Sequence, residues 1–116
     1  MTNPIKTEKL IELLADPREI TLLDVRRKAD YQAAPKKIPS ASWQNPEAVD
    51  AWMGQVPDDK LIVTYCVKGG PVSQSVTDRL RQIGRNAVYL DGGIKAWVEK
   101  GQPLSEGPDK ADNKLL

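Results

Sequence analysis

Cys66 is the only cysteine of the 116-residue chain, and it stands where an apolar run ends and a glycine-rich segment begins. Residues 61–65 have the apolar, β-branched character of a buried strand, and residues 73–83 have apolar side chains at the spacing of a helix. A strand, a loop and a helix in this order direct backbone N–H groups and the positive end of the helix dipole towards the loop. The thiol at Cys66 is therefore predicted to act as a thiolate nucleophile without a neighbouring base.

The residues that follow Cys66 are the candidate substrate-binding residues. Two adjacent glycines allow a backbone to curve around an anion, although glycines in such a loop can also be simple turn residues. The loop contains one cationic side chain, which could attract an anionic substrate or be merely solvated. The expected substrate-binding residues are Val67, Lys68, Gly69, Gly70, Val72 and Ser73.

The composition excludes several kinds of chemistry. The chain has no histidine, which removes Ser–His–Asp and Cys–His nucleophile activation and all histidine metal sites. One cysteine without histidine also leaves no structural zinc site, so we expect neither a metal nor a cofactor. A single cysteine forms no internal disulfide and fits a reducing compartment, and we expect the cytoplasm.

The charges of the chain nearly cancel, with 17 basic and 16 acidic residues. This balance indicates neither nucleic acid nor an anionic membrane as a partner. The sequence also contains no run of about 18 apolar residues of the kind that spans a membrane, and its first residues do not have the apolar core of a signal peptide.

Apolar runs alternate with helical patterns along the chain. Strands are expected over residues 20–25, 41–43, 61–65 and 87–90, and helices over residues 7–15, 28–33, 46–53, 73–83 and 94–100. Thr7 and Asn45 are the expected caps of the first and third helices. Continuous apolar strands separated by helices are typical of an α/β fold with a parallel sheet covered on both faces. Residues 1–104 are expected to form one domain, and residues 105–116 a polar, disordered tail.

The carboxyl ends of the predicted strands place three segments at one edge of the sheet, where ligands bind in open α/β folds. One segment contains Asp24 and Arg26, one begins at Cys66, and the third is the sequence Asp-Gly-Gly at residues 91–93, which is most simply a turn. Asp24 and Arg26 are supporting candidates that either contact substrate or form an ion pair that braces the loops. Arg26 and Asp30, four residues apart, are a further possible pair.

Four separated segments occur in an order and at a spacing that together identify a family. They are Leu22-Leu23-Asp24-Val25-Arg26, Lys37-Ile38-Pro39-Ser40-Ala41, Val63-Thr64-Tyr65-Cys66 and Leu90-Asp91-Gly92-Gly93. Over about residues 7–104 the chain resembles the single-domain rhodaneses, which are sulfurtransferases. The resemblance implies a three-layer α/β/α fold with a mainly parallel, five-stranded sheet.

The resemblance also implies a two-step reaction at Cys66. The thiolate would take the outer sulfur of thiosulfate or of a persulfide donor, and Cys66 would carry it as a persulfide. Cyanide or a thiol would then remove that sulfur. The implied partners are a small-molecule sulfur donor and a thiol or cyanide acceptor, and a sulfur-acceptor protein is a further candidate.

The loop departs from the Cys-x-x-Gly-x-Arg pattern of many active rhodaneses, because Pro71 occupies the sixth position. Proline has no N–H, and no arginine in the loop can neutralise a doubly anionic donor. Hydrolysis of phosphate esters, which related cysteine phosphatases perform with a loop arginine, is therefore not expected. Two alternatives stay open, a non-catalytic protein-binding module and a thiol redox sensor. The sequence does not assign a role to Gln74.

Overall fold

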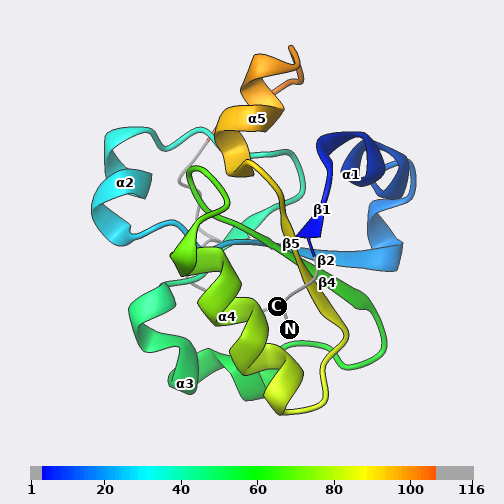
Figure 1. The fold of residues 1–116 in the computed structure, drawn as a ribbon, viewed down its shortest axis with the longest axis vertical. Helices are drawn as coiled ribbons and strands as arrows, with labels where there is room; N and C mark the ends of the chain where they lie inside the picture. The colour runs from blue at the N-terminus through cyan, green and yellow to red at the C-terminus, as the bar shows by residue number, and fades with distance from the viewer. Residues whose placement is uncertain (1–3, 107–116) are drawn as a thin grey trace.

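The computed structural model describes residues 4–106. Its strands alternate with helices along the chain (Figure 1). The bounds are β1 (Pro4–Ile5), α1 (Thr7–Leu13), β2 (Ile20–Asp24), α2 (Lys28–Ala33), β3 (Ser42–Trp43), α3 (Val49–Trp52), β4 (Leu61–Tyr65), α4 (Pro71–Gln82), β5 (Ala87–Leu90) and α5 (Gly93–Glu99). Short 3-10 helices cover Pro17–Glu19, Pro46–Ala48 and Met53–Gln55.

Within residues 4–106 the strands form one five-stranded sheet in the order β1-β5-β4-β2-β3, and each neighbouring pair is parallel. The register of β2 on β4 runs from Ile20 opposite Leu61 to Asp24 opposite Tyr65, so these two strands end level with each other. The predicted α/β class and parallel sheet are thus confirmed. Residues that follow β2 and β4 must lie side by side at the carboxyl edge of the sheet.

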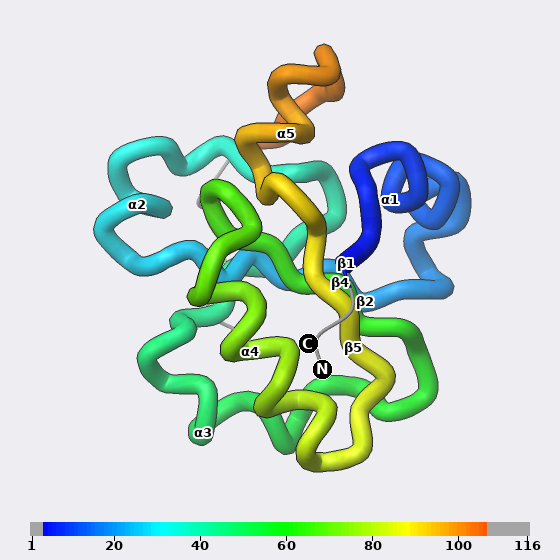
Figure 2. Tube along the Cα trace, viewed as in Figure 1, coloured from blue at the N-terminus to red at the C-terminus, as the bar shows by residue number. Residues whose placement is uncertain are grey.

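Helices cover both faces of the sheet, as the views in Figures 1 and 2 show. Leu22 and Val63 belong to a buried apolar cluster with residues of α1 and α5. Leu23 and Ile62 belong to a second cluster with residues of α3 and α4. Successive side chains of a strand point to opposite faces, so a strand between two helical layers is buried on both faces and mostly apolar. This explains why the strand sequences are continuous rather than alternating.

The edge strand β1 was absent from the sequence-based prediction. It pairs with β5 through Pro4 opposite Tyr89 and Ile5 opposite Leu90. A two-residue strand carries no detectable period, and its proline is tolerated because an edge strand needs few ladder donors. The prediction of strands from apolar runs therefore found four of the five strands in this sheet.

The helix ends differ from prediction at several places. The predicted cap at Thr7 is wrong, because Lys6 is the N-cap of α1 and Thr7 is the buried first residue of the helix. The predicted cap at Asn45 is confirmed, since its side chain accepts a hydrogen bond from the N–H of Glu47 at 3.0 Å. The segment that it caps is only partly α-helical: α3 lies between two 3-10 turns.

The end of the described chain is tied to the loop before β3. Lys37 N–H donates to the carbonyl of Ser105 at 3.0 Å, and Ser105 N–H donates to the carbonyl of Lys37 at 2.7 Å. Ser105, which was expected in the tail, is thus held by a β-bridge. The last ten residues of the expected tail, 107–116, lie outside the described residues. Among the described helices, none is long and apolar enough to cross a membrane.

Candidate active site

Cys66 follows directly on the central strand β4 and lines a pocket of about 260 Å³. The residue is 5% exposed, and its thiol donates a hydrogen bond to Oγ of Ser73 at 3.2 Å. Ser73 is completely buried on α4. A hydroxyl can rotate to donate as well as accept, so Ser73 can donate to the sulfur once the thiol has lost its proton. The structure therefore brings together two residues that the sequence placed seven positions apart.

The helix α4 begins at Pro71, two residues earlier than predicted. Proline is favoured at the first helical position, where its fixed φ suits the helix and its missing N–H would have no intrahelical acceptor. Val72 and Ser73 are the next two residues, and their N–H groups also lack an intrahelical acceptor. The positive end of the twelve-residue helix α4 is thus formed beside Cys66.

The loop between Cys66 and α4 adds further donors. The hydrogen bonds found among residues 4–106 include no acceptor for the N–H groups of Val67, Lys68, Gly69 and Gly70. Free backbone N–H groups next to a helix N-terminus form an anion-binding concavity. Of the predicted substrate-binding residues, Val67, Lys68, Gly70 and Val72 line the Cys66 pocket and Ser73 contacts the thiol, whereas Gly69 does not line the pocket. This arrangement can stabilise a thiolate or an anionic persulfide.

The carbonyl groups of the loop are fixed from outside it. Gln74 Nε2 donates to the carbonyl of Gly69 at 3.0 Å, a contact that the sequence analysis did not predict. Gly69 has a φ of 73° and lies against the turn after β5. A Cβ at this position would stand 2.7 Å from the nitrogen of Gly92 and 2.9 Å from the oxygen of Leu90. Glycine is required here by both the backbone angle and the close approach.

The Asp-Gly-Gly sequence is more than a simple turn. Gly93 has a φ of 61°, and a Cβ on it would overlap the carbonyl oxygens of Cys66 and Val67. The next two N–H groups, of Ile94 and Lys95, donate to these same two carbonyls at 3.0 Å each. The N-terminus of α5 thus holds the first peptide groups of the Cys66 loop in place.

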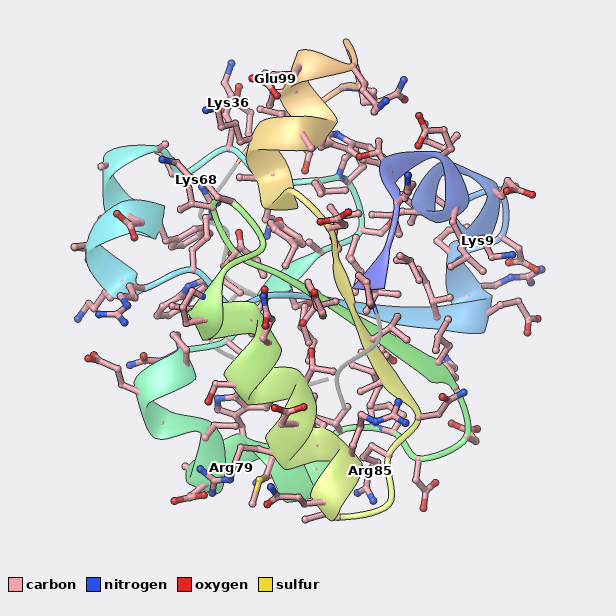
Figure 3. All side chains as sticks on the ribbon, viewed as in Figure 1. Lys9, Lys36, Lys68, Arg79, Arg85 and Glu99 are labelled. Carbon is pink, nitrogen blue, oxygen red and sulfur yellow. The ribbon has the colours of Figure 1, made fainter. Side chains whose placement is uncertain are left out.

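The mouth of the pocket carries charges from two elements. Lys68 is exposed and lines the pocket, and Figure 3 shows it extending from the loop towards α2. Arg27 and Asp30, at the start of α2, line the same pocket. The sequence analysis did not select them for the site. Their place directly after the carboxyl end of β2 was the available signal.

Asp24 and Arg26 form a buried ion pair behind the pocket. Arg26 Nη2 lies 2.7 Å from Oδ2 of Asp24, and Arg26 Nε lies 3.0 Å from both carboxylate oxygens. The guanidinium also donates to the carbonyls of Ala34 at 2.8 Å and Lys36 at 3.1 Å. Burial alone would lower the pKa of Arg26, but the hydrogen bond and charge of Asp24 raise it above its ordinary value. The suggested pair of Arg26 with Asp30 is not the one that forms, and Arg26 acts as a brace.

Tyr65, at the end of β4, completes this brace. Its hydroxyl donates to Oδ2 of Asp24 at 3.1 Å and accepts the N–H of Ile38 at 3.1 Å. Burial, with the negative charge of Asp24 as the next cause, raises the pKa of Tyr65 well above its ordinary value. Tyr65 was not predicted from the sequence as a site residue, although a tyrosine that ends a buried strand needs a partner for its hydroxyl.

Replacing Asp24 with asparagine is expected to lower the free energy of unfolding by about 3–5 kcal/mol, because it leaves the Arg26 guanidinium buried and unpaired. Chemical denaturation measures this loss. The matched control is Asp16→Asn: Asp16 pairs with Arg18 at the same sequence spacing, at 3.1 Å, but on the surface. We expect that change to cost less than about 1 kcal/mol. Equal losses in the two variants would contradict the bracing role.

The comparisons agree with this architecture. A family model of the rhodanese-like domain matches residues 6–100. The chain is 32% identical over 104 residues to a sulfurtransferase of Allochromatium vinosum, covering 90% of this chain and 95% of that one. A rhodanese-related protein of Thermoplasma volcanium has a TM-score of 0.77 and 25% identity, covering 89% of this chain and 97% of that one.

A second solved structure is that of a thiosulfate sulfurtransferase of Pseudomonas aeruginosa, with a TM-score of 0.74 and 24% identity. The superposition covers 92% of this chain but only 20% of that longer protein, so it is evidence for the fold alone. The match of the family model over most of the chain and the similarity to the Allochromatium protein over 95% of its length decide the assignment. The chain belongs to the rhodanese-like family of sulfurtransferases.

Proposed function

We propose that this protein transfers sulfane sulfur through a persulfide on Cys66. The observation that carries the proposal is the hydrogen bond between Cys66 Sγ and Ser73 Oγ, at 3.2 Å, beside the N-terminus of α4. The N–H groups of residues 67–70 and 72–73 are the proposed binding groups for the anionic sulfur species. Such a reactive thiol suits a reducing compartment, and we place the protein in the cytoplasm.

The first step is a displacement at sulfur. The Cys66 thiolate attacks the outer sulfur of the donor, a new S–S bond forms, and the old bond breaks with its electron pair on the leaving group. That leaving group is sulfite when thiosulfate is the donor, or a thiolate when a persulfide is the donor. In the second step cyanide or a thiolate attacks the outer sulfur, and the electron pair returns to Cys66 Sγ. Neither step needs a metal or a cofactor.

The side chains around the pocket bear on the choice of donor. Arg26 is bonded to Asp24 and to two carbonyls, so its guanidinium is not available to a donor. The cations at the mouth are Lys68 and Arg27, which stand beside the single carboxylate of Asp30 in the lining of this pocket. We propose that these two side chains attract anionic donors. We also propose that a monoanionic persulfide is a better donor than thiosulfate, because thiosulfate carries two negative charges and the loop has no arginine to offset the second one.

The experiment is a comparison of two complete reactions with purified protein. Thiosulfate with cyanide is followed by the formation of thiocyanate, and an organic persulfide with a thiol acceptor is followed by the loss of donor. The proposal expects turnover in at least the persulfide reaction. Failure of both reactions would overturn the proposed function and favour a non-catalytic binding module.

Replacing Ser73 with alanine is expected to lower the rate of persulfide formation by about 10- to 100-fold, because a hydrogen bond to a charged group contributes about 1.5–3 kcal/mol. Stopped-flow measurement of donor consumption in a single turnover checks this value. Ser75→Ala is the matched control, since Ser75 lies on the same helix but is exposed. A Ser73→Ala rate equal to that of the control would remove Ser73 from the mechanism.

A further inference from the structure

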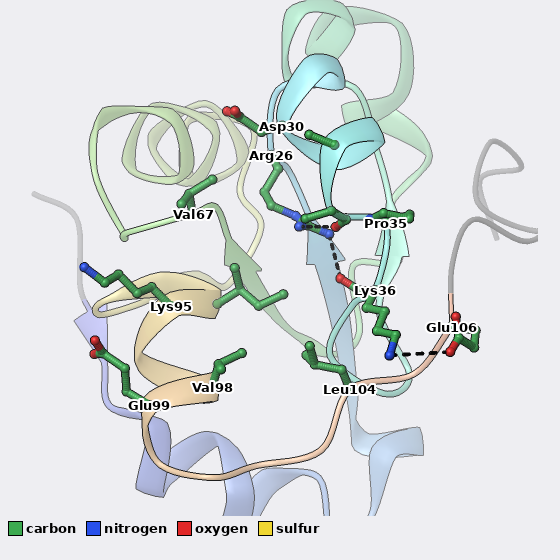
Figure 4. Close-up of a pocket in the computed structure, with 13 residues that line it drawn as sticks. Arg26, Asp30, Pro35, Lys36, Val67, Lys95, Val98, Glu99, Leu104 and Glu106 are labelled. Carbon is green, nitrogen blue, oxygen red and sulfur yellow. Dashed lines mark hydrogen bonds and ion pairs between the residues drawn. The ribbon is translucent and has the colours of Figure 1, made fainter.

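A larger cavity, of about 810 Å³, lies beside the Cys66 pocket (Figure 4). It is bounded by the end of α2 and the residues after it, by α5, and by the end of the described chain. We call it the α5 groove. Its apolar lining consists of Ala33, Ala34, Pro35, Val67, Val98 and Leu104 together with Ile94. Its size falls within the range of small-molecule pockets, which are also mostly apolar.

The α5 groove adjoins the Cys66 pocket. Arg26, Asp30 and Val67 line both of them. Val67 is the residue next to Cys66, and its side chain is drawn at the edge of the groove in Figure 4. A ligand in the groove therefore lies next to Val67, the residue after Cys66, at the boundary between the groove and the Cys66 pocket.

The charges of the groove do not favour a charged occupant. Lys36 and Glu106 form an ion pair at 3.7 Å, and Lys95 and Glu99 lie one turn apart on α5. Figure 4 shows these four side chains at the outer edge of the groove. A cation and an anion stand at each of these two places.

Where the groove meets the Cys66 pocket, Arg26 is paired with Asp24, and the carboxylate of Asp30 adds a negative charge. An anionic occupant is therefore disfavoured, the edge suits a neutral polar group, and the interior suits a carbon chain.

Val98 is the clearest sign that the lining is open to a ligand. It is 49% exposed, and the other large apolar residues exposed within residues 4–106 are Ile11 and Ile83, at 38% and 37%. Neither of those two residues lines the groove. An exposed valine inside an apolar concavity that adjoins the pocket of the proposed nucleophile is typical of a binding site, whereas a single exposed residue on a convex surface needs no explanation.

We propose that the α5 groove binds the carbon chain of an uncharged organic thiol, which is the sulfur acceptor of Cys66. The inference rests on the proposed function. The thiol of the ligand first loses its proton to solvent water, its thiolate attacks the outer sulfur of the Cys66 persulfide, and the bond between the two sulfurs of the persulfide breaks. Its electron pair returns to Cys66 Sγ, and the acceptor leaves as an organic persulfide that carries the proton of the outer sulfur.

The test measures how fast Cys66 persulfide is discharged by mercaptopropanol and by mercaptohexanol, which differ only in chain length. Each rate constant is divided by the rate constant for the reaction of the same thiol with free cysteine persulfide. This ratio removes the difference in nucleophilicity between the two thiols. Full burial of three further methylenes in the groove is expected to make the ratio for mercaptohexanol up to roughly 60-fold larger. In Val98→Asn this advantage is expected to fall at least about threefold, and in the control Ile83→Asn it is expected to persist.

Two results would overturn the inference. One is a discharge rate that does not depend on chain length, and the other is a dependence that Val98→Asn leaves unchanged. A second copy of the chain could instead cover the groove. In that case Val98→Asn alters the sedimentation coefficient and leaves the dependence of the discharge rate on chain length unchanged, and this result also overturns the inference.

A binding measurement separates this inference from the proposed function. The Cys66→Ser protein is titrated with mercaptohexanol, and the methyl resonances of Val98 and Leu104 are followed by NMR. The inference expects these resonances to shift and those of Val88, which does not line the groove, to stay unchanged. Shifts at Val98 and Leu104 would support the groove even if Cys66 forms no persulfide, and their absence would overturn it even if Cys66 does.

Discussion

Replacing Cys66 with serine is expected to lower sulfur transfer at least about a thousandfold, because the nucleophile itself is removed. An alcohol at this position is not ionised near neutral pH and does not attack sulfane sulfur. The change is nearly isosteric and keeps a donor for Ser73, so the free energy of unfolding is expected to stay within about 1 kcal/mol. The initial rate with a persulfide donor and denaturation of the same samples measure the two quantities.

The control for this prediction is Ser75→Cys, which places a thiol on the exposed side of α4 in the Cys66→Ser protein. That thiol has neither the loop donors nor the hydroxyl of Ser73, and we expect it not to restore transfer. Activity retained in Cys66→Ser alone would contradict the persulfide mechanism directly. Restoration by an exposed thiol would show that the position of Cys66 does not matter.

Replacing Gly93 with alanine is expected to lower the free energy of unfolding by roughly 2–5 kcal/mol. A left-handed conformation costs a residue with a Cβ about 1–2 kcal/mol, and overpacking against fixed atoms adds about 1–3 kcal/mol. The new methyl group would overlap the carbonyls of Cys66 and Val67. Sulfur transfer is expected to fall even in the fraction that stays folded, because the peptide groups beside the thiol are displaced. Denaturation and single-turnover rates test both effects.

The control variant Gly84→Ala separates the cost of a left-handed backbone conformation from the cost of the close contact that Gly93 makes with the Cys66 loop. Gly84 also has a positive φ, 87°, but a Cβ there would meet nothing within 4 Å. We expect that variant to lose about 1–2 kcal/mol of stability and no activity. If the two variants lose the same amount, the contact between the Gly93 turn and the Cys66 loop does not position the site.

The main layers of the fold could be predicted because the buried strands are long apolar runs. The bounds predicted for β4 and β5 agree with the structure, and Gly84 correctly marked the end of the helix before β5. The prediction did not find β1, whose two residues pair only because the rest of the sheet is already formed. It also placed the start of α4 two residues late, since Pro71 was considered for its missing N–H and not as the first residue of a helix.

The candidate site was predictable where the residues lie near Cys66 in the sequence. Ser73 and the glycines follow the thiol within one loop, so a strand–loop–helix pattern was enough to select them. The contacts that fix this loop come from distant segments, as the contact of Gly93 with Cys66 and that of Tyr65 with Asp24 show. Such contacts depend on the order of the strands in the sheet, which local patterns do not contain. Gln74 is an intermediate case: its role depends on the direction of one side chain.

The most direct test of the central claim is the mass of the intact protein after incubation with an organic persulfide, and separately with thiosulfate. The account predicts a gain of one sulfur atom that is absent from Cys66→Ser and is lost when cyanide is added. Loading by the persulfide alone would identify the donor class and agree with the missing loop arginine. An unchanged mass with both donors, in protein whose thiol is shown to be reduced, would contradict the proposal that Cys66 carries sulfur.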